Sequence, residues 1–320
     1  MTDAVAPPVA SPAVLAADVA AVRERWTGLG LPGLFDVHTH FLPEGLERRV
    51  WAQFDAAGPK IGRPWPIRYR LTTDERVALL RDMGVRRFPS LPYAHRPGVA
   101  ERLNDWARDF AVRVPESLWS ATFFPEEGAE AYVAGLVADG VEVFKVHVQV
   151  GEFELDDPLL TPVWGLLEDS GTPVVVHAGH APVGNDHTGP EPLARLLRRF
   201  PRLAIVAAHL GAPDYLAFCD LAAAYDRVHL DTTMVFTDFW EADYPVGLVD
   251  RLRDLEPKVL LGTDVPTIPY PYAHQLDALA RLGLGDDWMR SVCWHNGLEL
   301  FGDGVRSGGE SSGTPGGSTR

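Results

Sequence analysis

Four histidines and one aspartate follow apolar segments of the chain and could bind a metal ion. They are His38 and His40 in LFDVHTH, His177 in PVVVHA, His209 in LAIVAAHL and Asp264 in KVLLGTD. Imidazole nitrogens and carboxylate oxygens are ligands that Zn²⁺ and Mn²⁺ take in proteins. If LFDVHTH is a strand, its side-chain period of two turns His38 and His40 to the same side. The residue types therefore indicate a divalent-metal site.

Eight short apolar segments alternate with amphipathic stretches through the middle of the chain. Strands that are buried on both faces consist of continuous runs of Val, Ile and Leu, and the stretches between them have helical periodicity. The predicted strands cover residues 34–38, 85–91, 118–124, 141–148, 173–178, 203–210, 227–233 and 258–264. Eight strand–helix units of this length predict an α/β fold, a single (β/α)8 TIM barrel. An open doubly wound sheet is the alternative, and the first segment lacks the Gly-rich loop typical of it.

One barrel domain is predicted for residues 16–302. The Ala- and Pro-rich residues 1–15 and the Gly- and Ser-rich residues 303–320 are predicted to be disordered. Residues 41–72 form a long loop insertion between the first strand and its helix, rich in Trp, Pro and Arg. Loops after the strands build the active-site face of a barrel, so we interpret this insertion as a lid or substrate wall. A plain surface excursion is the alternative.

The charge and cysteine content exclude several partners. The 320 residues carry a formal net charge of −15, which gives no electrostatic footprint for nucleic acid or an anionic membrane. No apolar run of 18 residues and no basic N-terminal signal region is present, and Cys219 and Cys293 lie far apart. We therefore predict a cytoplasmic protein with reduced thiols and a small-molecule substrate. A homodimer is compatible with this composition.

The order DVHTH, VVVHAG, AAHLG and LLGTDVP resembles the metal-dependent amidohydrolase superfamily over about residues 30–302. It is most similar to amidohydrolase family 2, TIM-barrel enzymes related to aminocarboxymuconate-semialdehyde decarboxylase. The resemblance implies that His38, His40, His177 and Asp264 bind one divalent metal, Zn²⁺ before Mn²⁺. It also implies that Asp264 accepts a proton from water, and that His209 acts on water or substrate as a second catalytic residue.

The fourth apolar segment, FKVHVQ, places Lys145 and His147 on one face of a strand. Only three of the 29 basic residues are lysines, so a lysine within an apolar strand is unusual for this chain. In binuclear relatives a carboxylated lysine bridges two metals at the corresponding strand. We predict a single metal, a free Lys145, and contact of Lys145 and His147 with substrate. Pairing of Lys145 with Asp36 is the structural alternative.

Two reactions fit these residues. The leading hypothesis is hydrolysis of a C–O or C–N bond of a small organic substrate by a metal-activated water. The alternative is nonoxidative decarboxylation of an aromatic or muconate-type acid, for which Arg63 or Arg68 of the insertion could bind the carboxylate. A TatD-like nuclease is disfavoured, because such enzymes have a glutamate where this chain has FKVH. A barrel retained only for binding is disfavoured by the complete set of candidate ligands.

Overall fold

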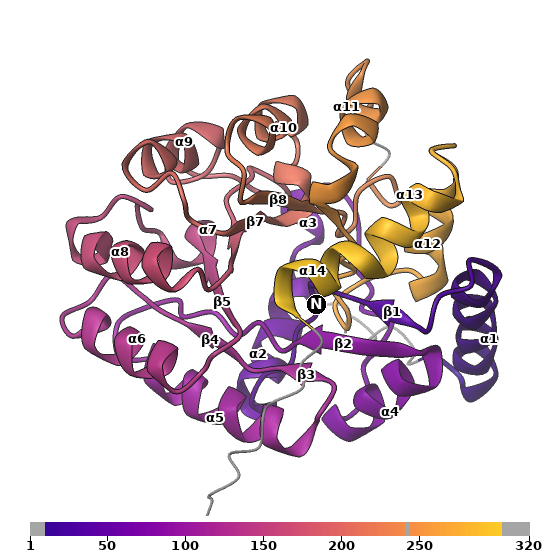
Figure 1. Cartoon of the computed structure of the whole chain (residues 1–320). Coiled ribbons are helices and arrows are strands. Elements are labelled where there is room, and N and C mark those ends of the chain that lie inside the picture. Colours follow the sequence, from indigo (N-terminus) through magenta and orange to yellow (C-terminus); the bar gives the residue numbers. More distant parts are fainter. Residues whose placement is uncertain (1–9, 241–242, 303–320) are drawn as a thin grey trace, which may run out of the picture.

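A ring of helices surrounds the strands in the computed structural model of the chain (Figure 1). The structure describes residues 10–240 and 243–302. Its strands are β1 (Leu34–Phe35), β2 (Val85–Pro89), β3 (Ser117–Leu118), β4 (Ser120–Thr122), β5 (Val143–His147), β6 (Val174–His177), β7 (Ile205–Ala207), β8 (Val228–Asp231) and β9 (Val259–Leu260). Every ladder between them is parallel, in the orders β1-β2-β3 and β4-β5-β6-β7-β8-β9.

Backbone contacts join the two strand series at both of their ends. At one seam, β3 and β4 are consecutive pieces of one predicted strand, interrupted at Trp119. The Trp119 amide there donates to the Glu142 carboxylate at 2.7 Å instead of to a strand. At the other seam, the Val37 amide donates to the Leu261 carbonyl at 2.8 Å, and Thr39 forms a parallel bridge with Val265. The predicted (β/α)8 barrel is confirmed.

Helices follow the strands around the ring. They are α1 (Pro12–Gly28), α2 (Glu44–Asp55), α3 (Gly58–Ile61), α4 (Thr73–Met83), α5 (Ala100–Arg113), α6 (Ala129–Ala138), α7 (Val148–Gly151), α8 (Thr161–Ser170), α9 (Pro190–Arg199), α10 (Tyr215–Ala224), α11 (Leu248–Asp254), α12 (Tyr272–Ala280), α13 (Asp286–Arg290) and α14 (Asn296–Phe301). No helix among the described residues is both long and apolar enough to cross a lipid bilayer.

The N-terminal helix begins earlier than the boundary predicted from composition. Helix α1 starts at Pro12, and the Ser11 hydroxyl caps it by accepting from the Val14 amide. A proline in the first turn loses no helical hydrogen bond, so the Pro-rich stretch can start the helix. The predicted tails at residues 1–9 and 303–320 lie outside the described residues.

Side chains along each strand alternate between the barrel interior and the helices. Val175 of β6 points into the interior, whereas Val174 and Val176 pack in the layer beneath the helices. Helix α14 lies across the barrel axis (Figure 1), and Phe301 packs on Phe35 of β1 with ring centroids 5.7 Å apart. One end of the barrel is therefore filled by apolar side chains, which leaves the carboxyl ends of the strands for polar residues.

The long insertion after β1 is held against that carboxyl-end face. Arg76 of α4 is fully buried, and its guanidinium pairs with the Glu47 carboxylate of α2 at 2.6 Å. The Trp65 indole N–H donates to the Thr267 carbonyl at 2.6 Å, in the loop after β9. The Tyr69 hydroxyl donates to a carboxylate of α1. These hydrogen bonds and the ion pair favour the interpretation of the insertion as a substrate wall over that of a plain surface loop.

Candidate metal centre

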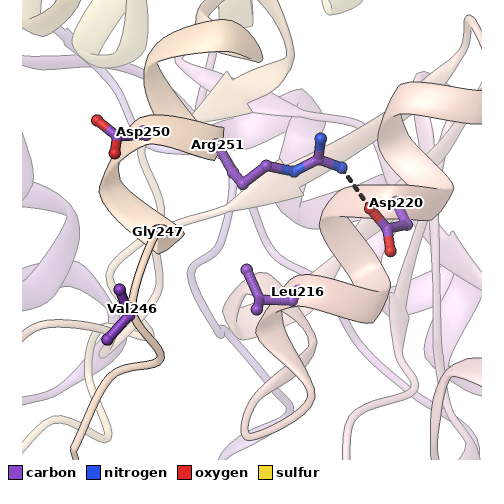
Figure 2. Close-up of a pocket in the computed structure, with 6 residues that line it drawn as sticks. All are labelled: Leu216, Asp220, Val246, Gly247, Asp250 and Arg251. Atoms are coloured by element: carbon purple, nitrogen blue, oxygen red, sulfur yellow. Dashed lines mark hydrogen bonds and ion pairs between the residues drawn. The ribbon is translucent and has the colours of Figure 1, made fainter.

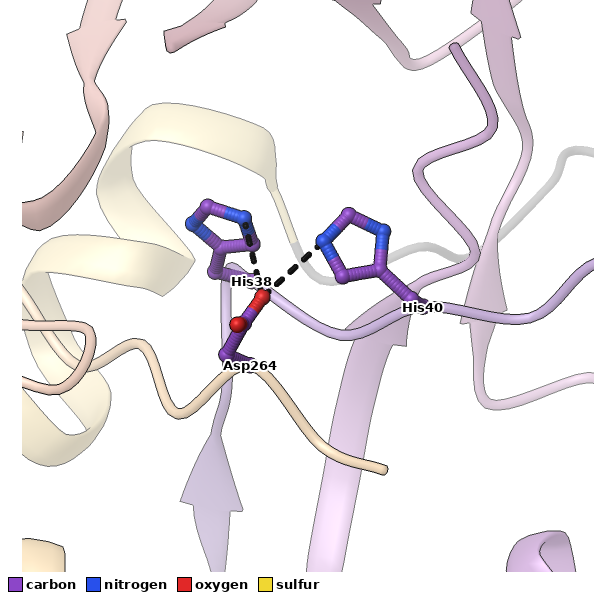
Figure 3. Close-up of side chains that lie close together, drawn as sticks. All are labelled: His38, His40 and Asp264. Atoms are coloured by element: carbon purple, nitrogen blue, oxygen red, sulfur yellow. Dashed lines mark ion pairs between the residues drawn. The ribbon is translucent and has the colours of Figure 1, made fainter. Parts of the chain in front are cut away.

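Three ligand atoms converge at the carboxyl ends of β1 and β9. One nitrogen each of His38 and His40 and one carboxylate oxygen of Asp264 lie within 4.8 Å of one another. Asp264 Oδ1 is 3.0 Å from His40 Nε2 and 3.7 Å from His38 Nε2, and Figure 3 shows both rings turned toward this carboxylate. A single ion placed between these atoms could contact all three, so they are the core of a metal site.

The two histidines converge although they do not lie within a regular strand. Strand β1 ends at Phe35, so the predicted strand over residues 34–38 is too long. The chain continues extended, and the bridge between Thr39 and Val265 attaches it to the loop after β9. The rings of His38 and His40 are 5.1 Å apart between centroids.

Hydrogen bonds determine which nitrogen of each ring is free. His38 Nδ1 lies 2.8 Å from the Asp231 carboxylate, and His40 Nδ1 lies 3.1 Å from the Leu91 carbonyl. A carbonyl or an ionised carboxylate only accepts, so both Nδ1 atoms carry the hydrogen and donate it. The lone pair of each neutral ring is then on Nε2, the atom that faces Asp264. This is the protonation pattern that a metal-binding histidine requires.

His177 and His209 have the same kind of support. His177 Nε2 donates to the Ala181 carbonyl at 2.9 Å, which leaves the lone pair on Nδ1. His209 Nδ1 donates to the Thr233 carbonyl at 3.1 Å, which leaves it on Nε2. The two rings are 4.7 Å apart, and His209 is 5.1 Å from His38. His177 lies outside the 4.8 Å trio, so its place among the ligands stays a prediction.

Burial keeps His38, His177 and His209 neutral, and the groups around Asp264 keep its carboxylate charged. Burial lowers the pKa of His38 to about 3 and the pKa values of His177 and His209 below their ordinary range. Burial alone would raise the pKa of Asp264, but the histidines beside it, His40 first, outweigh burial, and the pKa lies below its ordinary value. Neutral imidazoles and an ionised carboxylate bind a cation without first losing protons.

The predicted alternative partner of Lys145 is occupied by other groups. The Asp36 carboxylate accepts from the Thr263 hydroxyl at 2.5 Å and from the Tyr272 hydroxyl at 3.0 Å. Lys145 Nζ instead lies 3.2 Å from His38 Nε2. Burial lowers the pKa of Lys145 to about 8. The amine is therefore part of the candidate metal centre and is not paired with Asp36.

His147 differs from the other histidines in its hydrogen bonding. Its ring stacks on His177 at 3.9 Å between centroids, nearly parallel at 9°. The Val150 amide donates to His147 Nδ1 at 3.4 Å, so Nδ1 is an acceptor and the neutral ring carries its hydrogen on Nε2. His147 can therefore donate a hydrogen bond into the site, which suits the predicted contact with substrate.

The two predicted catalytic residues have unusual backbone conformations. Asp264 has a φ of 73° and His209 a φ of 56°, in the left-handed region that residues other than glycine rarely adopt. The Asp264 amide donates to the His38 carbonyl at 2.8 Å, which holds the two ligand loops together. A Cβ on Gly262 would lie 2.1 Å from the Thr233 hydroxyl, so only glycine fits there. Such strain is typical of functional sites.

Sequence reasoning missed Asp231, which supports two of the histidines. This fully buried carboxylate at the end of β8 accepts from His38 Nδ1 and, at 2.8 Å, from the His209 amide. Burial would raise its pKa, but the hydrogen bonds that it accepts from His38 and from the His209 amide hold the pKa below the ordinary range. The signal was present, because RVHLDTT has a carboxylate near its carboxyl end, much as KVLLGTD does.

Replacing Asp231 with Asn is expected to weaken metal binding by about 10- to 100-fold. The amide cannot hold the His38 ring as firmly as a charged acceptor, and loss of such supporting partners has this typical effect. Titration with Zn²⁺ in a metal buffer would measure the affinity. Asp226→Asn, an exposed residue near the other end of β8, is the matched control. Equal affinity of the parent and Asp231→Asn would contradict the supporting role.

A surface cavity of about 480 Å³ lies apart from this centre. It is formed by α10, the start of α11 and the loop before it, as Figure 2 shows. Leu216 and Val246 line it together with an ion pair between Asp220 and Arg251. The cavity contains no histidine and no candidate ligand, so it does not contribute to the chemistry of the histidine centre.

Comparison with known proteins agrees with this arrangement. The sequence matches the family Amidohydro_2, Amidohydrolase, over residues 35–302. Among curated proteins, none matches the chain. An uncharacterised TIM-barrel protein from Bordetella bronchiseptica has a TM-score of 0.68 and 18% identity, over 86% of this chain and 100% of that one.

Two further solved structures share the fold. A 5-carboxyvanillate decarboxylase from Sphingomonas paucimobilis has a TM-score of 0.60 and 16% identity, over 84% of this chain and 99% of that one. A protein from Acinetobacter baumannii, named as a probable 2-pyrone-4,6-dicarboxylic acid hydrolase, has a TM-score of 0.56 and 14% identity over the same shares. Identities this low show the fold and not the reaction. The family match, by contrast, covers most of the chain, and the chain belongs to the amidohydrolase family.

Proposed function

We propose that the protein is a metal-dependent hydrolase that acts on a C–O or C–N bond of a small organic substrate. The observation that carries the proposal is the convergence of His38, His40 and Asp264 within 4.8 Å. Their lone pairs and charge fit one divalent ion, with His177 Nδ1 as a fourth donor and Zn²⁺ as the first choice over Mn²⁺. When bound there, the ion supplies a Lewis acid and lowers the pKa of a water toward about 7.

Asp264 and His209 would move and orient the proton of the attacking water. The ionised Asp264 carboxylate has one oxygen toward the histidines and the other 3.1 Å from the Thr267 hydroxyl. It can accept a proton as the nucleophile forms. The neutral His209 ring offers Nε2 as an acceptor, so it suits orientation of a water O–H better than polarisation of a substrate carbonyl.

Lys145 and His147 would contact the substrate from β5. Their side chains lie two positions apart on one face of the strand, with Lys145 innermost and His147 nearer the opening. Both offer N–H donors, so an oxygen-rich substrate group such as a carbonyl or carboxylate fits between them. No anion among the described residues forms an ion pair with Lys145, and the negative charges nearest to it belong to the candidate metal centre.

One observation favours the decarboxylase alternative. Arg68 lies in the insertion, and its amide donates to the Ile268 carbonyl at 2.9 Å, in the loop that follows Asp264. Its side-chain Nε is buried without a hydrogen-bond partner among the described residues. A guanidinium with an unpaired Nε–H, on a segment that contacts the loop after Asp264, could bind a substrate carboxylate, as a decarboxylase requires. The insertion is therefore compatible with either reaction.

A substrate panel tests the proposal directly. Protein reconstituted with Zn²⁺ or Mn²⁺ would be incubated with lactones, amides and aromatic acids, and CO₂ release would be scored separately from ring or amide opening. We expect opening of a lactone or an amide without CO₂, abolished by a chelator and restored by metal. CO₂ release from an aromatic acid would show the alternative to be right. If the metal-loaded protein turns over none of these substrate classes, both the hydrolase proposal and the decarboxylase alternative are contradicted.

Replacing Lys145 with Met is expected to lower kcat/KM while each chain keeps about one metal. Met fills the same apolar space but offers no donor to the substrate, whereas a carboxylated lysine would be needed to hold a second metal. Metal content would be measured by elemental analysis. The control is Lys258→Met, a lysine whose Nζ donates to backbone carbonyls away from the site. Two metals in the parent, and fewer in Lys145→Met, would show a binuclear centre.

A further inference from the structure

A tyrosine that no sequence pattern identified lies beside the candidate metal centre. Tyr93 follows β2 in a loop that is fixed on both sides of it. Before it, Leu91 has a φ of 36°, and its carbonyl accepts from His40 Nδ1. After it, the Ala94 amide donates to the Thr122 hydroxyl at 3.1 Å. The same turn therefore orients a candidate ligand and positions the Tyr93 ring.

The Tyr93 ring contacts two of the site histidines. Its centroid is 5.7 Å from that of His40, edge to face at 82°, and 5.1 Å from that of His147. The charge of Asp264 also acts on the phenol, since it adds to burial in raising the pKa of Tyr93. The Tyr93 ring thus lies beside a candidate ligand, His40, and beside His147, which is expected to contact substrate.

The Tyr93 hydroxyl has no hydrogen-bond partner among residues 10–240 and 243–302. Other tyrosines buried near this end of the barrel are satisfied by carboxylates. The Tyr272 hydroxyl donates to Asp36 at 3.0 Å, and the Tyr69 hydroxyl donates to Asp18. Tyr93 is half-buried, so its hydroxyl is free to donate to water or to a bound ligand. An unpaired phenol at a polar site therefore indicates a partner that comes from outside the chain.

We propose that Tyr93 is a substrate-contacting catalytic residue whose hydroxyl donates a hydrogen bond to a carbonyl or carboxylate oxygen of the substrate. This inference rests on the proposed function of the same site. A phenol is neutral at pH 7 and donates in a defined direction, whereas the ammonium of Lys145 acts as a point charge. Together they would select a substrate with an oxygen acceptor close to the bond that reacts.

Tyr93→Phe tests the inference, because it removes the hydroxyl and keeps the ring that packs on the histidines. Acetohydroxamate, a small oxygen ligand for metal centres, is the binding probe, measured by calorimetry on Zn²⁺-loaded protein. We expect the Kd to rise about tenfold or more, with metal content and Tm unchanged. With a panel substrate that the parent turns over, kcat/KM should fall by a similar factor. The matched control is Tyr225→Phe, which follows α10 at the opposite end of the barrel and should match the parent.

The outcomes separate this inference from the proposed function. If the parent binds acetohydroxamate and turns over a substrate, and Tyr93→Phe has the same Kd and kcat/KM, the inference is wrong and the function stands. Tyr93→Phe could instead bind the probe more weakly only because it binds less metal or has a lower Tm. In that case the residue is structural and the inference is again wrong. If the parent binds neither metal nor probe, the proposed function fails, and the inference fails with it.

Discussion

Replacing Asp264 with Asn is expected to lower kcat by 100-fold or more while each chain keeps about one metal at saturating Zn²⁺. The amide keeps an oxygen that can face His40, but it cannot accept a proton from water, and loss of a general base has an effect of this size. Steady-state kinetics on a panel substrate would give kcat, and elemental analysis would give the metal content.

Asn is the suitable replacement at this position for a second reason. Asp264 has a φ of 73°, and Asn is one of the few residues that adopts this left-handed region with little strain. The variant should therefore fold with the same loop after β9. Asp277→Asn, in an ion pair with Arg25 on the outside of the barrel, is the control and should keep full activity. A kcat for Asp264→Asn within a few-fold of the parent would exclude Asp264 as the proton acceptor.

The barrel could be predicted because its strands are parallel and buried on both sides. Continuous apolar runs such as VVVHA then indicate buried parallel strands. Because these runs alternate with amphipathic stretches, only a few chain topologies are possible. The break in the third strand could not be predicted. It depends on the Glu142 carboxylate, which reaches the Trp119 amide from a residue 23 positions later in the chain. Local sequence does not contain a contact of that kind.

The location of the candidate ligands could be predicted from the sequence, but the hydrogen bonds of the site residues could not. Polar residues at the ends of apolar runs must meet at one face of a barrel, which is why His38, His40 and Asp264 converge. The sequence does not show that His38 donates to Asp231, or that the Tyr93 hydroxyl is left unpaired. Both features depend on how segments that are far apart in the sequence pack against one another. Applying the strand-end rule to every run would have found Asp231, but it would not have found Tyr93, which lies beyond its strand.

Replacing His38 with Ala is expected to remove the bound metal and abolish activity. His38 is central to the site, since its Nε2 faces Asp264 and its Nδ1 is held by Asp231. Without the ring, the buried Asp231 carboxylate loses a partner and a cation loses a ligand that is already oriented to receive it. His177→Ala should also lose metal if His177 Nδ1 is the fourth donor.

The matched control for both variants is His229→Ala, a half-buried histidine on β8 whose Nδ1 contacts a backbone carbonyl. It should fold with some loss of stability and keep about one metal per chain, because its ring is not among the site histidines. Elemental analysis of the three purified variants, with their Tm values, would separate loss of a ligand from loss of the fold. Full metal occupancy in His38→Ala would overturn the assignment of the centre. Full metal occupancy in His177→Ala alone would show only that His177 is not the fourth ligand. The assignment of His38, His40 and Asp264 would stand, because their convergence does not depend on His177.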